Sequence, residues 1–166
     1  MIVLGVDPGS NVTGYGVVSR TEAGQPRLVE CGVVRPPAVK DAAQKLAAIH
    51  AEIAELIRRH RPDVVSIETV FVAHNARSAL VLGQARGVVL LAAAQAGVPL
   101  AEYQPSVVKQ AVTGTGAATK AQVQQMTARL LRLASPPSPA DAADGVAIAL
   151  THCLRTGKVL KRAVVG

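Results

Sequence analysis

The sequence predicts one domain with a mixed α/β fold, because strand patterns come first and helices and strands then alternate. A length of 166 residues fits a single domain. Apolar residues make up 49% of the chain, which is enough for a packed core and too many for a disordered segment. Aromatic residues are scarce, so that core must be built from Val, Leu, Ile and Ala.

Three strands are predicted at the start of the chain, over residues 2–6, 13–18 and 27–34. The first is ended by the turn sequence Asp7-Pro-Gly-Ser, and a second turn signal precedes residue 27. Connections this short join neighbouring strands that run in opposite directions. We therefore expect an antiparallel meander.

Apolar residues at three- and four-residue intervals predict a helix over residues 39–60, which Pro62 prevents from continuing. A strand of buried type is predicted over residues 63–68. A long helix rich in Ala and Leu follows over residues 75–96, and a short strand over residues 100–103. Because helices connect the first, fourth and fifth strands, these three should run parallel.

Three more helices are predicted over residues 106–113, 119–133 and 140–154, with a proline-rich stop at 135–139 before the last one. Residues 1–156 then form the domain. Residues 157–166 form a basic tail that we expect to be mobile.

The net charge of +7 is unevenly distributed. Residues 1–68 hold eight basic and eight acidic side chains, whereas residues 69–140 hold six basic side chains and one acidic side chain. A basic field around a few isolated carboxylates suits a protein that processes a polyanion such as nucleic acid. The alternative is a charge that serves only solubility.

The cellular location is expected to be the cytoplasm. Two cysteines, Cys31 and Cys153, cannot form a disulfide framework, so a reducing compartment fits. We expect no membrane span, because no apolar run reaches eighteen residues, and no export signal, because the first residues lack a basic segment.

Four carboxylates stand out by position. Asp7 ends the first buried strand and Glu68 ends the fourth, so parallel neighbours would bring both to one edge of the sheet. Asp141 and Asp144 are three residues apart in the last helix and share a face. Each acid also has an ordinary structural interpretation: a turn residue, a strand end, or charges that compensate a helix dipole.

Four converging carboxylates repel one another, and divalent metal is the natural compensation. Oxygen ligands suit Mg²⁺ or Mn²⁺ better than Zn²⁺. Two such ions can clamp a phosphodiester, one activating water and the other stabilising the leaving oxygen. His152 lies on the face of Asp144; we interpret it as structural, with a place beside the site as the alternative.

The glycine-rich segment 5–14 permits a second hypothesis, in which a turn between two strands cradles nucleotide phosphates through backbone N–H groups. Actin-like proteins and sugar kinases have such a turn. Their two-domain folds need a much longer chain, and no Walker A or dinucleotide-binding sequence is present.

Five blocks, in this order, resemble the RuvC family of crossover junction endodeoxyribonucleases. They are LGVDPGS with VTGYGV at 4–17, IE with VF and Asn75 at 67–75, LGQARG at 82–87, VKQ with Gly114, Gly116 and Lys120 at 108–120, and ADAAD with THC at 140–153.

This resemblance implies an RNase H-like fold, a five-stranded mixed sheet flanked by helices, so that residues 1–156 would be an RNase H-like nuclease domain. It implies a homodimer that resolves four-way (Holliday) junctions in homologous recombination and DNA repair. Paired symmetric nicks would leave 5′-phosphate and 3′-hydroxyl ends. The implied cofactor is Mg²⁺, with Mn²⁺ possible and two ions per active site. The branch-migration helicase complex of RuvA and RuvB is an implied partner.

The resemblance also assigns site residues. The catalytic, metal-binding acids would be Asp7, Glu68, Asp141 and Asp144. The DNA-binding residues would be Phe71, stacked on bases near the crossover, with Lys109 and Lys120 near the cut. Without the resemblance, a core position is the usual interpretation of a lone Phe such as Phe71, although its place just after Glu68 favours stacking, and a solvated face is an equal alternative for each lysine.

Two further points follow from the resemblance. The helix over 75–96 would be both a core helix and a dimer contact. His74 stands where many relatives have a stronger base, so the expected DNA contact there is weak or dependent on pH. A protein that binds junctions without cutting them is the alternative of another class. In that case four acids facing DNA would be repulsive without a purpose.

Overall fold

A five-stranded mixed sheet forms the centre of the molecule, in the order β3-β2-β1-β4-β5. The computed structural model describes residues 1–9, 11–21, 24–39, 41–69 and 76–163, with side chains described to residue 156. The strands are β1 (Ile2–Asp7), β2 (Thr13–Ser19), β3 (Arg27–Val34), β4 (Val64–Glu68) and β5 (Leu100–Tyr103). The first three pair antiparallel, while β1, β4 and β5 run parallel, so the predicted meander and crossovers are confirmed.

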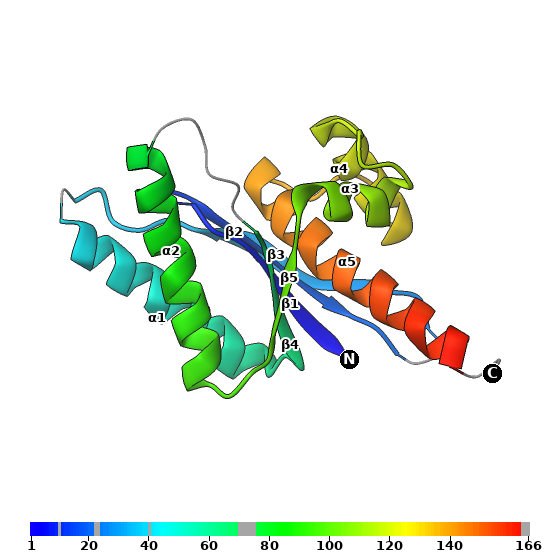
Figure 1. Ribbon diagram of the computed structural model, residues 1–166, viewed down its shortest axis with the longest axis horizontal. Coiled ribbons are helices and arrows are strands. Elements are labelled where there is room, and N and C mark those ends of the chain that lie inside the picture. The colour runs from blue at the N-terminus through cyan, green and yellow to red at the C-terminus, as the bar shows by residue number, and fades with distance from the viewer. Residues whose placement is uncertain (10, 22–23, 40, 70–75, 164–166) are drawn as a thin grey trace.

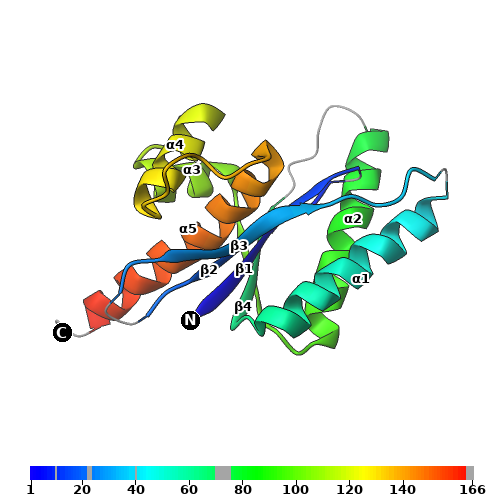
Figure 2. The ribbon, with the colours of Figure 1, turned by 180° about the vertical axis from the view of Figure 1, so that it is seen from behind.

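Helices cover both faces of this sheet. They are α1 (Ala42–His60), α2 (Ala76–Gln95), α3 (Pro105–Thr113), α4 (Lys120–Leu130) and α5 (Ala140–Ala163). Helices α1 and α2 lie side by side on one face, and α5 crosses the other with α3 and α4 beside its N-terminal half (Figures 1 and 2). The three layers confirm the predicted α/β class.

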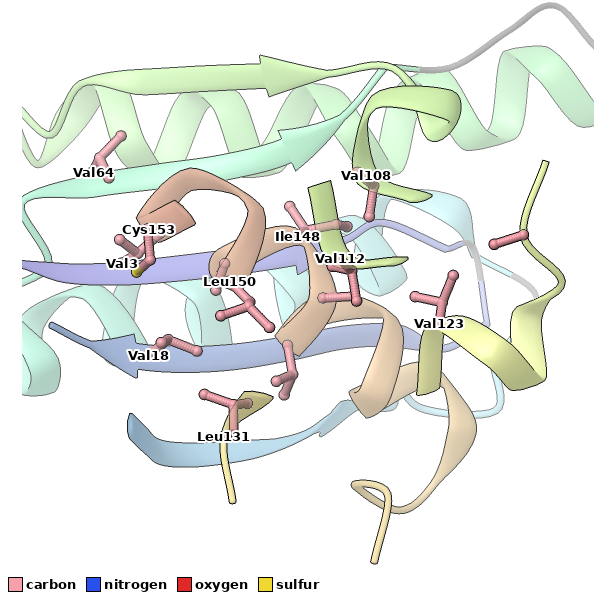
Figure 3. Packing of buried hydrophobic residues seen from close by; sticks show 14 residues of the cluster. Val3, Val18, Val64, Val108, Val112, Val123, Leu131, Ile148, Leu150 and Cys153 are labelled. Carbon is pink, nitrogen blue, oxygen red and sulfur yellow. The ribbon is translucent and has the colours of Figure 1, made fainter. Parts of the chain in front are cut away.

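Alternation along the strands separates two cores. On β4, Val65 and Ile67 pack with the α1 and α2 cluster, whereas Val64 packs with the α5 cluster. Figure 3 shows the second cluster, where Ile148 and Leu150 of α5 are packed against the sheet. Because successive strand residues point to opposite faces, Glu68 belongs to the same face as Val64, the face that α5 covers.

Glycines let α5 lie unusually close to the sheet. A Cβ atom at Gly5 of β1 would overlap the backbone of Gly145 and Ala149 in α5. A Cβ atom on Gly145 would in turn lie 2.5 Å from the Cα atom of Tyr15. Any larger side chain would push helix and sheet apart. The glycines therefore fix how near the start of α5 lies to the end of β1.

Helix boundaries differ from the predicted ones where capping decides them. Helix α1 begins at Ala42 because the Asp41 carboxylate accepts a hydrogen bond from the Ala43 backbone N–H at 2.8 Å. Helix α4 ends at Leu130, shortly before Arg132 adopts a positive φ of 55°.

Helix α5 runs to Ala163 and thus passes the end expected at residue 154. A single glycine at 157 costs a helix only about 1 kcal/mol, and good helix formers follow it. The division into a domain over residues 1–156 and a mobile tail stays a prediction.

Helix α2 is long and apolar enough to pass a length-and-composition test for a membrane span, a test that core helices of soluble proteins also pass. One side of it, with Ala85, Val89 and Ala92, is buried in the α1 and α2 cluster. The other side exposes Leu80 and Leu91. The expected absence of a membrane span stays a prediction.

Candidate active site

Two of the four predicted acids lie at neighbouring strand ends. Asp7 is the last residue of β1 and Glu68 the last residue of β4. The parallel register pairs Val6 with Ile67, which brings the two acids next to each other at the carboxyl edge of the sheet. This edge is where open α/β sheets usually hold their functional sites.

Helix α5 adds Asp144 to the same place. A pocket of about 190 Å³ opens at this edge, and its wall includes Asp7, Glu68 and Asp144. The other residues that line it are Pro105, Val108, Lys109, Lys120, Val123 and Ala147. Asp141 does not line the pocket, although its charge acts on Asp7 and Asp144. The structure thus brings three of the four acids together in the pocket wall, and the fourth acts on two of them through its charge.

Two lysines reach the pocket from short helices. Lys109 lies on α3, and Lys120 is the first residue of α4. A capping box fixes this helix start: Thr119 Oγ1 accepts from the Gln122 N–H at 3.2 Å, and the Thr119 N–H donates to Gln122 Oε1 at 2.8 Å. From there the Lys120 ammonium donates to Asp144 Oδ2 at 2.6 Å.

The carboxylates are electrostatically strained. Burial, reinforced by the charge of Asp144, raises the pKa of Asp7 to about 6. Burial and then the charge of Asp7 raise the pKa of Glu68 to about 7. The pKa of Asp144 is also raised by burial, although the bond to Lys120 opposes the shift. Both lysine charges thus compensate the acids only in part.

A divalent metal fits this site by donor chemistry. The acids supply oxygen atoms only, the donor set that Mg²⁺ and Mn²⁺ prefer. Burial and then the neighbouring acids raise the pKa values of Asp7 and Glu68, and a bound cation would offset both effects. Within the described ranges, no three Asp, Glu, His or Cys side chains are close enough to form a ready-made metal site. The side chains would therefore have to draw together around an ion.

The remaining predicted residues are placed as follows. Phe71 and His74 fall outside the described residues. His152 does not line the pocket; its Nδ1 atom lies 2.7 Å from the hydroxyl oxygen of Tyr103, with the rings edge to face. The environment of His152 agrees with its structural interpretation.

Sequence reasoning missed two features of the site. The capping box that orients Lys120 has a readable signal, the sequence Thr119-Lys-Ala-Gln122, because Thr followed three residues later by Gln is its signature. The bond between Lys120 and Asp144 has no such signal, since the two residues are 24 positions apart.

Comparisons with known proteins agree with this geometry. The family model described as crossover junction endodeoxyribonuclease RuvC matches residues 3–152. The RuvC of Pelotomaculum thermopropionicum is 47% identical over 152 residues, covering 92% of this chain and 92% of that protein. The RuvC of Chromohalobacter salexigens is 53% identical over 160 residues, covering 96% of this chain and 84% of that protein.

Solved structures show the same likeness. The Thermus thermophilus RuvC structure in complex with a Holliday junction substrate has a TM-score of 0.85 and 37% identity, covering 94% of this chain and 95% of that one. The yeast mitochondrial Holliday junction resolvase Ydc2 has a TM-score of 0.68 at 14% identity, covering 96% of this chain and 82% of that one, a likeness of fold alone. The predicted RNase H-like fold is confirmed.

Proposed function

This chain belongs to the RuvC family of crossover junction endodeoxyribonucleases, and from that premise we propose how its own residues resolve a Holliday junction. The activity is endonucleolytic: the phosphodiester of a four-way junction is hydrolysed, in homologous recombination and DNA repair. We assign this chemistry to the pocket at the ends of β1 and β4. The observation that carries the assignment is the meeting of Asp7, Glu68 and Asp144 with two lysines in one pocket.

The four acids are the proposed metal ligands. Nucleases of this type depend on divalent metal. We assign Asp7, Glu68 and Asp144 to hold it within the pocket, and Asp141, whose charge acts on Asp7, to complete the set. We favour Mg²⁺, with two ions per site and Mn²⁺ as a substitute. When bound, the metal supplies activation of water and charge stabilisation at the leaving 3′-oxygen, which yields 5′-phosphate and 3′-hydroxyl ends.

The chain's own cations orient the DNA. Lys109 and Lys120 line the pocket with the acids, which supports a role for their ammonium groups in binding the oxygens of the phosphate under attack. Without such cations, DNA would be repelled by a pocket lined with carboxylates. Phe71, three residues after Glu68 in the sequence, is the proposed residue that stacks on a base near the crossover.

The exposed side of α2 supports the homodimer that paired nicks require. Leu80, Leu91 and Ala94 are exposed at helical spacing, and a Cβ atom at Gly83 or Gly87 would meet nothing within 4 Å. Apolar side chains around small residues suit close packing of one helix against its copy. We propose that two chains pair through this face. The partnership with RuvA and RuvB, and a place in the cytoplasm, rest on the family.

The test of this function is a synthetic four-way junction incubated with the protein, with and without Mg²⁺. We expect two symmetric nicks with metal, none without it, and none in a duplex of the same sequence. Products ligatable without prior treatment would establish the end chemistry. Binding of the junction without any cutting, in Mg²⁺ or in Mn²⁺, would contradict the proposed function.

A further inference from the structure

The carboxylate of Asp144 is already paired with the positively charged side chain of Lys120. The Lys120 ammonium lies 2.6 Å from its Oδ2 atom, and the two side chains are very different in exposure, 60% for Lys120 and 23% for Asp144. The carboxylate is thus set into the pocket while the lysine reaches it from the solvent. An ion pair with one exposed partner is weak and exchanges readily.

The other charged residues nearby do not share this arrangement. Lys109 lines the same pocket, yet in the described part of the chain its ammonium takes part in no ion pair. Asp141 lies three residues before Asp144 on α5 and acts on Lys120 through its charge, without a hydrogen bond to it. Lys120 and Asp144 are therefore a specific pair within a cluster of six charged residues, the others being Asp7, Glu68, Lys109 and Asp141.

We propose that Lys120 is an exchangeable placeholder for metal at Asp144: loading a divalent ion displaces the ammonium, which becomes free to bind a DNA phosphate. This inference rests on the proposed function, because it assigns Asp144 to the metal and Lys120 to DNA. It adds a linkage that neither assignment contains. The carboxylate of Asp144 offsets the positive charge of Lys120, so an ion that takes Asp144 away from Lys120 should strengthen the binding of Lys120 to DNA, and DNA bound to Lys120 should strengthen the binding of that ion.

The physical basis is an exchange of partners without loss of compensation. A carboxylate in a pocket is costly to leave without a counter-charge, and Lys120 supplies one when no ion is bound. The capping box joins Thr119 to Gln122 and does not hold the side chain of Lys120, so this long side chain can turn from Asp144 to a phosphate while α4 stays in place. No movement of the fold is required.

The first test measures metal binding in the free protein, by calorimetric titration with Mn²⁺. In Lys120→Gln no ammonium has to be displaced, so we expect Mn²⁺ to bind about fivefold tighter or more than in the wild type. Lys109→Gln is the matched control: it removes the same charge from the same pocket without freeing a carboxylate, and it should tighten binding much less.

The second test measures junction binding by fluorescence anisotropy in EDTA, where nothing is cut. Asp144→Asn releases Lys120, whereas Asp141→Asn removes an equal charge from the same helix without releasing it. We expect Asp144→Asn to bind the junction about fivefold tighter than Asp141→Asn. The slope of the logarithm of affinity against the logarithm of salt concentration should also be steeper by about one for Asp144→Asn. In the double variant Asp144→Asn with Lys120→Gln, this gain should vanish.

Two outcomes would overturn the proposal: equal Mn²⁺ affinities for Lys120→Gln and Lys109→Gln, or equal junction affinities for Asp144→Asn and Asp141→Asn. A failure of the proposed function is distinguishable, because the wild type would then leave the junction uncut in Mg²⁺ and in Mn²⁺. A wild type that cuts normally, together with either equality, would reject the placeholder alone. Thermal melting of each variant without metal checks that it is folded.

Discussion

Glu30 on β3 and the pair Asp7 and Glu68 are carboxylates of one sheet in opposite electrostatic surroundings. Glu30 accepts hydrogen bonds from Tyr15 Oη at 2.8 Å and from Arg59 Nη2 at 2.6 Å, and lies 2.9 Å from His60 Nε2. Burial alone would raise its pKa, but these partners outweigh burial and lower it. Among the residues that the structure describes, Asp7 and Glu68 have no comparable set of donors, and burial raises their pKa values.

These opposite pKa shifts distinguish an acid with a structural role from acids that are available to bind a ligand. Glu30 shows that this fold can provide a half-buried carboxylate with hydrogen-bond donors, here from β2 and α1. At the carboxyl ends of β1 and β4, by contrast, Asp7 and Glu68 lie next to each other, and their negative charges repel. Such strain is typical of functional sites, where stability is given up for binding or catalysis.

The largest expected effect comes from Asp7→Asn. This change removes a proposed metal ligand while keeping the size of the side chain, so cutting of a junction should fall by about 100-fold or more. Junction binding should persist, because the lysines remain. Gel assays of cutting and binding, run side by side, measure both. Loss of binding together with cutting would assign Asp7 a structural role.

Glu30→Gln should lower stability and leave cutting unchanged. It leaves Arg59 and His60 without their carboxylate, and we expect the free energy of unfolding to fall by about 1–2 kcal/mol, measured by urea denaturation. Cutting at a temperature where the variant is folded should match the wild type. A strong loss of cutting in the folded variant would show that the two groups of acids are not independent.

The dependence of metal-free stability on pH should have opposite signs at the two places. Because the folded-state pKa values of Asp7 and Glu68 are raised, the folded protein holds protons that the unfolded chain releases, so stability declines as the pH rises through about 6 and 7. The lowered pKa of Glu30 works the other way: its contribution is present above the ordinary value and is lost as the pH falls.

The pH dependence of metal-free stability can be measured as melting temperatures in EDTA between about pH 5 and pH 8. Asp7→Asn should flatten the decline toward high pH, because the variant side chain does not ionise. Glu30→Gln should leave the slope in that range unchanged. If the melting temperature of Asp7→Asn fell more steeply with rising pH than that of the wild type, the pKa of Asp7 would not be raised in the folded protein, and the account would be wrong.

Much of this comparison could be predicted from the sequence, since strand ends are local features. Asp7 and Glu68 each follow an apolar run, and parallel pairing of those runs brought them together as expected. The meander, the crossovers and ten elements were readable from periodicity and turn residues. The approach of α5 was not, because it depends on glycines far apart in the chain, such as Gly5 and Gly145.

Other parts depend on contacts that no local pattern encodes. Asp141 and Asp144 share a face of α5, yet only Asp144 lines the pocket, because Asp141 lies almost one turn nearer the start of the helix. The partners of Glu30 come from β2 and the end of α1, so its structural role emerges only from the folded chain. Phe71, the predicted stacking residue, lies outside the described residues and stays a prediction.

The most direct test of the strained acids as a metal site is the rise in melting temperature on adding Mg²⁺ near neutral pH, compared among the wild type, Glu30→Gln and Asp7→Asn. An ion that binds only the folded protein stabilises it. We predict a clear, concentration-dependent rise in the wild type, an equal rise in Glu30→Gln despite its lower starting point, and little or none in Asp7→Asn. A rise in Asp7→Asn as large as that of the wild type would contradict the account.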